Sequence, residues 1–166
     1  STFDNIFEEA KAKFSDKENV EIIRANSLDG YKILKNKNFD NFDYIYVDAS
    51  HQYEKVLDDL IFYKDLLKKE TGCFQLNDCC HSDLGVKQNL GVLEAANKFC
   101  KIANFVPVIA VNRNFTDVLL APKNSQIIED INFIVENNDI ISVEVPNELF
   151  PNLSVKVGKR PQICFA

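Results

Sequence analysis

The run Phe-Asp-Tyr-Ile-Tyr-Val-Asp at residues 42–48 constrains the fold more than any other part of this sequence. Aromatic and β-branched residues are typical of buried strands, and this run ends abruptly on the carboxylate of Asp48. Apolar side chains at helical spacing follow from Tyr53 to Leu67, and the pattern stops at Lys68–Gly72, where basic residues and glycine favour a helix end. A buried strand that leads directly into a long helix is typical of α/β proteins.

The rest of the chain repeats this alternation. Residue patterns predict helices over 3–14, 28–34, 86–99 and 127–134, and strands over 20–24, 73–76, 106–111 and 117–121. The turn Asn112-Arg113-Asn114 should join the last two strands as an antiparallel hairpin, and the proline-containing tail should be irregular or form short strands. We therefore expect a Rossmann-like α/β fold, with a mostly parallel sheet, helices on both faces and a C-terminal antiparallel hairpin.

Composition limits the kinds of partner and the cellular location that we expect for this chain. With 166 residues, 46% of them hydrophobic, the chain should form one compact domain. A net charge of -6 and no cluster of basic residues argue against nucleic acid. Apolar runs far shorter than about 20 residues argue against a membrane span. Five cysteines without a regular framework fit reduced thiols, which predicts a cytoplasmic protein.

Polar residues follow three predicted strands, at the end of a parallel sheet where ligands bind. They are Asn26 and Ser27 after the first strand, Asp48 and His51 after the second, and Asn77 and Asp78 after the third. Asp48 ends a buried strand and should need a partner, while Ser50 is the better N-cap for the helix that follows. An imidazole at His51 can act as a general base near neutral pH, although a helix-start histidine satisfied by solvent is the alternative.

Two metal sites can be read from these residues. Asp48, Asn77 and Asp78 form an oxygen-only set of the kind that Mg²⁺ prefers. The alternative is zinc or thiol chemistry at Cys79, Cys80 and His81, but adjacent cysteines are poorly spaced for one tetrahedral ion. None of the five glycines forms a phosphate-binding loop.

The order of elements resembles the class I S-adenosylmethionine-dependent methyltransferases, and among them the metal-assisted O-methyltransferases of sugars and other small hydroxylated molecules. The resemblance covers about residues 1–122, and its most specific part is DASH followed by a helix of the type YEKVLDDL. It implies that Asp48, Asn77 and Asp78 hold Mg²⁺, that His51 is the catalytic base on the substrate hydroxyl, and that Asn26, Ser27 and Asp48 contact S-adenosylmethionine.

The resemblance also implies a difference from the family. The family's first two strands, which carry the glycine-rich cofactor loop and the acid that holds the ribose, have no counterpart before the helix at 3–14. We therefore expect residues 1–122 to be the C-terminal portion of a methyltransferase-like domain, and 123–166 to be its last helix and tail. Unpaired strand edges should favour homo-oligomers. Whether such a chain is an active enzyme stays open, and the alternative is a non-catalytic remnant or binding module that does not bind the cofactor.

Overall fold

A computed structural model describes residues 2–111, 116–156 and 162–165, so the predicted turn at Asn112–Asn114 lies outside the described residues. The chain forms two compact units, Ser1–Asn38 and Phe39–Ala166. Residues 123–166 belong to the same unit as the sheet.

The first unit contains two helices, α1 (Thr2–Lys13) and α2 (Ser27–Asn36), as the sequence predicts. The strand predicted over 20–24 is wrong, because these residues form neither strand nor helix. A strand needs a neighbour to pair its backbone N–H and C=O groups, and no described residue pairs with this segment in a sheet. Instead, Arg24 forms an ion pair with Asp4 and lies 5.4 Å from the centre of the Phe7 ring.

The second unit is built on a four-stranded sheet with the order β1-β2-β4-β3. Its strands are β1 (Tyr44–Val47), β2 (Cys73–Leu76), β3 (Phe105–Val111) and β4 (Asp117–Pro122). The prediction of an α/β fold with an antiparallel β3–β4 pair is confirmed. The prediction of a mostly parallel sheet is wrong: only β1 and β2 are parallel, and β4 runs antiparallel to both of its neighbours.

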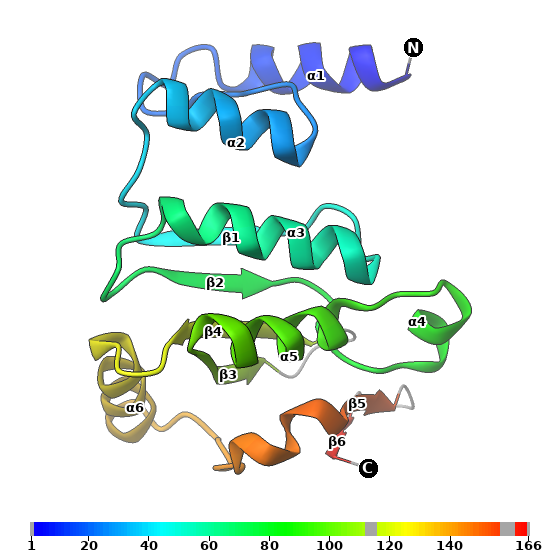
Figure 1. Ribbon diagram of the computed structural model, residues 1–166, viewed down its shortest axis with the longest axis vertical. Helices are drawn as coiled ribbons and strands as arrows, with labels where there is room; N and C mark the ends of the chain where they lie inside the picture. The colour runs from blue at the N-terminus through cyan, green and yellow to red at the C-terminus, as the bar shows by residue number, and fades with distance from the viewer. Residues whose placement is uncertain (1, 112–115, 157–161, 166) are drawn as a thin grey trace. The chain divides into compact units, whose positions relative to one another are not determined.

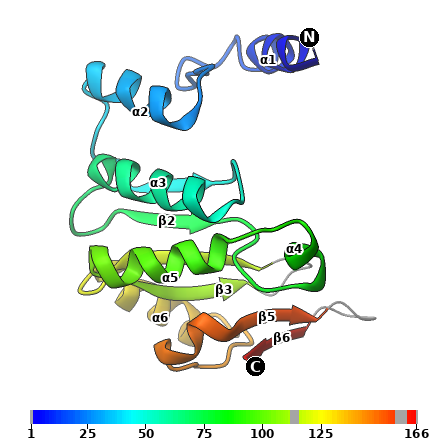
Figure 2. The same cartoon turned by 45° about the vertical axis from the view of Figure 1, so that its right-hand side comes forward.

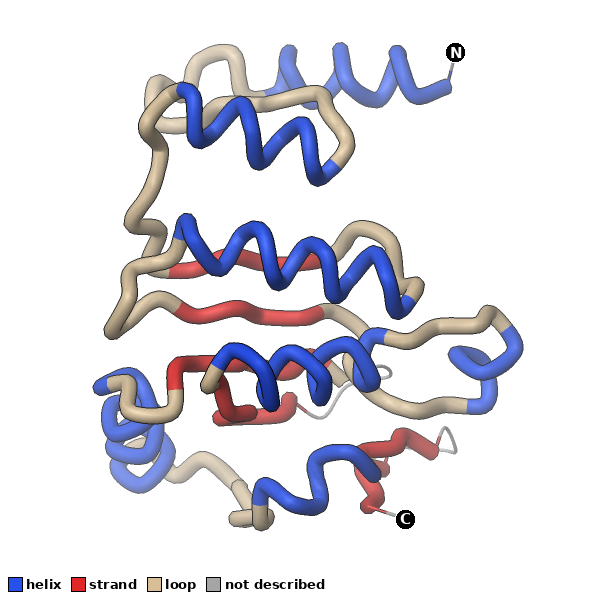
Figure 3. Tube along the Cα trace, in the orientation of Figure 1, coloured by secondary structure: helices blue, strands red, loops and turns tan. Residues whose placement is uncertain are grey.

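Helices α3 (Tyr53–Tyr63) and α5 (Val92–Ala103) lie side by side on one face of this sheet (Figures 1 and 2). The chain between β1 and β2 runs through α3 and the 3-10 turn η1 (Lys64–Leu66), which makes the parallel pair a βαβ unit (Figure 3). The single helix predicted over 86–99 is wrong. It is divided into α4 (Asp83–Lys87) and α5, because Asn89 adopts a left-handed conformation with φ 55°.

The C-terminal part of the chain contacts α5 and β3 through the 3-10 helix η2. Helix α6 (Gln126–Asn137) follows β4, and the 3-10 helix η2 (Asn147–Asn152) leads into a two-stranded sheet of β5 (Leu153–Lys156) and β6 (Gln162–Phe165). Within the described ranges, no helix is long and apolar enough to cross a membrane.

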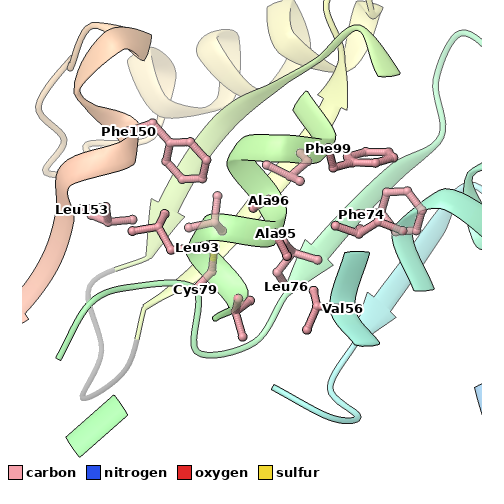
Figure 4. Packing of buried hydrophobic residues seen from close by; sticks show 14 of the residues in the cluster. Val56, Phe74, Leu76, Cys79, Leu93, Ala95, Ala96, Phe99, Phe150 and Leu153 are labelled. Atoms are coloured by element: carbon pink, nitrogen blue, oxygen red, sulfur yellow. The ribbon is translucent and has the colours of Figure 1, made fainter. Parts of the chain in front are cut away.

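The core of the second unit lies between the sheet and the two helices, and α5 is at its centre. Figure 4 shows Leu93 and Ala96 of α5 between Phe150 of η2 and Phe74 of β2. Phe99 packs edge-on against Phe74, with ring centres 5.7 Å apart. This packing fixes α5 against β2, and the predicted site residues Asn77 and Asp78 follow the end of β2.

Candidate functional site

The ends of β1 and β2 bring Asp48 and Asp78 to the same edge of the sheet. The strands are parallel neighbours in register, with Val47 opposite Leu76. The backbone N–H of Asn77 donates to the carbonyl of Val47 at 3.1 Å, so the pairing continues one residue beyond β2. The residues that follow the two strands therefore lie close together, as the sequence predicts for parallel neighbours.

The imidazole of His51 lies between these two carboxylates. Its Nε2 is 3.4 Å from Oδ1 of Asp48, and its Nδ1 is 3.7 Å from Oδ2 of Asp78. The His51 side chain is 20% exposed, and Nε2 is buried without a hydrogen-bond partner in the described structure. The ring thus has a carboxylate near each nitrogen, and Nε2 is covered by its surroundings although it makes no hydrogen bond.

The two carboxylates have different surroundings. The Asp78 side chain is 22% exposed, and burial raises its pKa above the ordinary value of 3.8, while the nearby His51 acts in the opposite direction. The Asp48 side chain is 50% exposed. The prediction that Asp48 is a buried carboxylate is therefore wrong, and the reason is that β1 forms the edge of the described sheet. Asp78 also has a left-handed backbone with φ 52°, a conformation that Asp and Asn adopt more readily than most residues.

Ser50 does not act as the N-cap that the sequence suggested for the following helix. The N-cap residue of α3 is Gln52, and no side chain caps the helix. Ser50 Oγ instead accepts a bond from the backbone N–H of Gln52 at 3.4 Å, in the loop that carries His51. This contact orders the loop from within and leaves the Asp48 carboxylate directed to His51.

A buried carboxylate that the sequence analysis missed supports this site. Asp117, the first residue of β4, is 7% exposed and accepts hydrogen bonds from the amides of Gln75 at 2.7 Å and Asn77 at 3.1 Å. Tyr44 completes the chain of contacts by donating from its hydroxyl to Gln75 at 2.7 Å. The sequence shows Asp117 at the start of a strand, but only the pairing of β2 with β4 brings it beside Asn77.

The described geometry does not fit the predicted magnesium site. The imidazole of His51 occupies the space between Asp48 and Asp78, and the amide nitrogen of Asn77 is bonded to Asp117. An ion shared by both carboxylates would have to displace the imidazole. Among the residues that the structure describes, no group of three or more His, Cys, Asp or Glu side chains is placed to hold a metal ion.

The alternative site at Cys79, Cys80 and His81 does not form a metal or thiol centre either. Cys79 is completely buried, and burial raises the pKa of its thiol well above 9.0 and that of Cys80 to a smaller extent. A low thiolate fraction disfavours nucleophilic chemistry at these two cysteines. His81 turns toward Glu94, with Nδ1 3.5 Å from Oε1, beside a cavity of about 200 Å³.

Asn26 and Ser27, the residues expected to contact the cofactor, lie in the first unit. Asn26 is the N-cap of α2: its Oδ1 accepts from the backbone N–H of Asp29 at 2.9 Å, and its Nδ2 donates to the Asp29 carboxylate at 2.8 Å. Both polar atoms of this side chain thus have a structural role, and Ser27 is the first residue of the helix.

Comparisons with known proteins show limited similarity. No protein-family model matches the chain, and no curated protein matches it. Among solved structures, a SAM complex is similar to part of the chain. That structure, the "crystal structure of M1.HpyAVI-SAM complex", shares 16% sequence identity and superposes with a TM-score of 0.45 over 64% of this chain. The chain spans about half of that protein, with 54% of its length covered.

Proposed function

We propose that this chain carries the acceptor side of an S-adenosylmethionine-dependent O-methyltransferase site, with His51 as the general base. The observation that supports this proposal is the His51 imidazole between two carboxylates at the ends of parallel strands. A small hydroxylated molecule is the proposed acceptor, in line with the resemblance of the DASH segment and its helix to that family.

The proposed chemistry begins when the half-exposed Asp48 side chain shifts and a hydroxyl of the acceptor reaches Nε2 of His51, which is buried and without a hydrogen-bond partner in the described structure. As the neutral imidazole takes up the hydroxyl proton, positive charge develops on the ring. Asp48 and Asp78 lie on either side of it and stabilise that charge, because an opposite charge within about 4 Å favours the protonated form. The resulting alkoxide is the nucleophile, and holding it in place contributes most of the rate.

S-adenosylmethionine would supply the methyl group as a sulfonium. The resemblance assigns Asn26, Ser27 and Asp48 to its binding. Asp48 fits this role, because half of its side chain is exposed and a carboxylate accepts several hydrogen bonds. Asn26 fits it poorly, since its amide caps α2. We therefore expect Asp48 to contribute more to cofactor binding than Asn26.

The test is isothermal titration of the full chain with S-adenosylmethionine, followed by methyl transfer from labelled cofactor to a panel of sugars and catechols. Binding with transfer supports the proposal. His51→Gln should then lower transfer by about 10²- to 10⁴-fold and leave cofactor binding unchanged, whereas His81→Gln should change neither. Absence of cofactor binding would contradict the proposal and favour the binding module that keeps the fold without the chemistry.

Self-association through the edge of β1 is a separate proposal. In the described part of the chain β1 pairs only with β2, and its sequence Tyr-Ile-Tyr-Val contains no lysine or proline that would discourage another strand. Sedimentation analysis should show an oligomer that Tyr46→Lys weakens. A monomer at all concentrations would contradict this proposal.

A further inference from the structure

Gly91 is a glycine whose backbone conformation does not require glycine. It is the N-cap residue of α5, with φ -139° and ψ 28°, and no side chain caps the helix there. A negative φ is accessible to other residues, and Ser, Asp and Asn are the preferred N-cap residues. The backbone conformation therefore does not require glycine at position 91. The lack of space around its Cα does.

A side chain at position 91 would collide with the start of α3. An added Cβ would lie 2.7 Å from Cβ of Tyr53, and 3.0 Å from both its Cα and its backbone nitrogen. Two of these three atoms belong to the main chain, so rotation of the Tyr53 side chain cannot relieve the contact. Any larger residue must push apart the N-terminal ends of α3 and α5.

The close approach allows a hydrogen bond to the candidate base. The backbone N–H of Gly91 donates to the carbonyl of His51 at 2.8 Å, two residues before Tyr53. The loop between β1 and α3 is therefore tied to α5 at the residue whose imidazole lies between Asp48 and Asp78. Because buried side chains hold α5 in the core, this hydrogen bond restrains the backbone of His51.

We propose that Gly91 is a positioning residue for His51, and that its missing side chain allows the main chain to hold the imidazole between the two carboxylates. The catalytic meaning of this role rests on the proposed function. The positioning itself is a property of the folded chain, so it can be tested without cofactor or acceptor.

The test uses an added histidine-containing reference peptide, because His81 contacts Glu94 in the first turn of α5 and can itself respond to a change at Gly91. The measured quantity is the ratio of the diethyl pyrocarbonate modification rates of His51 and of the reference peptide, determined by mass spectrometry. Gly91→Ala should raise this ratio at least about 3-fold, because the displaced imidazole leaves its buried position. It should also shift the imidazole ¹⁵N signals of His51.

Gly72→Ala is the matched control. Its Cβ would lie 2.6 Å from the carbonyl oxygen of Lys68 and 2.7 Å from the Lys68 nitrogen, a comparable collision. Gly72 directly precedes β2, at the opposite end of that strand from Asp78, so this variant should be destabilised without a change in the modification ratio. An equal rise of the ratio in both variants, or an unchanged ratio in a folded Gly91→Ala protein, would overturn the proposal.

A measurement on the unmodified chain covers the case in which Gly91→Ala does not fold. The hydrogen bond to His51 predicts that the Gly91 amide exchanges slowly, with protection comparable to that of the hydrogen-bonded α5 amides from Ala95 onward. Fast exchange of this amide in an otherwise protected α5 would overturn the proposal. Both experiments remain informative if the chain transfers no methyl group, so the failure of one proposal is separable from that of the other.

Discussion

At the scale of single residues, Asp78 combines two unfavourable features, a left-handed backbone and a partly desolvated carboxylate. Burial raises its pKa, so the native state keeps the proton to a higher pH than the unfolded chain does. Linkage then requires the free energy of unfolding to fall as the pH rises through the interval between the unfolded and folded pKa values. The ionised form of Asp78 is thus a cost to stability at neutral pH.

Asp78→Asn should remove this cost. Asparagine keeps the size of the side chain and tolerates the left-handed conformation, so the variant should be at least as stable as the original chain at pH 7. Urea unfolding between pH 3.5 and pH 7 should show a smaller decline for the variant. Asp58→Asn, on the exposed face of α3, should leave the pH dependence unchanged. A variant less stable than the original throughout this range would contradict the account of Asp78.

Some features of the candidate site can be predicted from the sequence, and others cannot. Placing Asp48, His51 and Asp78 together needed only the rule that polar residues after parallel strands meet at one edge. The role of Asp117 cannot be predicted from the sequence, because it depends on an antiparallel pairing between β2 and β4, and no local pattern encodes which strands pair. The exposure of Asp48 cannot be predicted for the same reason, since a strand's place at the edge or centre of a sheet depends on long-range pairing.

At the scale of elements, most helices and strands follow from periodicity and local residue preferences. Two segments differ from these predictions, because one lacks a partner strand and the other is interrupted. The segment 20–24 has strand-forming residues but no paired strand beside it, and the helix predicted over 86–99 is interrupted where Asn89 and Gly91 stand. Each is a place where backbone pairing or close packing overrides the preference of individual residues.

Helix α6 is joined to the loop before β2 by one buried serine. Ser125, 4% exposed, donates from its hydroxyl to the carbonyl of Glu70 at 2.6 Å and accepts from the backbone N–H of Ile127 at 3.4 Å. Ser125→Ala should lower the free energy of unfolding by about 1 to 2 kcal/mol, because the bond of a buried hydroxyl to the Glu70 carbonyl and a helix cap are both lost. Ser15→Ala, which removes an exposed bond to Ala12, should cost less than about 0.5 kcal/mol. Equal costs in urea unfolding would contradict this assignment.

The packing of α5 on the sheet depends on its aromatic contacts. Phe99 is fully buried against Phe74 and Phe105. Phe99→Ala should destabilise the protein by about 3 to 5 kcal/mol, since it removes a large buried side chain and leaves a cavity. Phe133→Ala, at a position 66% exposed on α6, should cost less than about 1 kcal/mol. Denaturant unfolding of the pair checks this, and similar losses would show that α5 is not the centre of the core.

At the scale of the whole molecule, the core belongs to one of the two units. Every buried hydrophobic side chain among the described residues lies between Val56 and Val155, within the unit Phe39–Ala166. A shortened chain that begins at Phe39 should therefore fold by itself. Its thermal unfolding should be cooperative, with an enthalpy of about 90 kcal/mol as expected for its size. A broad transition without cooperativity in calorimetry would contradict the assignment of a self-sufficient core to this unit.

The central claim is that β1 and β2 place a histidine base between two carboxylates. Long-range ¹H–¹⁵N correlation spectra of the two imidazoles test it most directly, because each ring nitrogen reports its own surroundings. We predict that Asp78→Asn shifts mainly Nδ1 of His51, that Asp48→Asn shifts mainly its Nε2, and that the His81 signals stay unchanged in both variants. His51 signals that respond to neither substitution would contradict the claim.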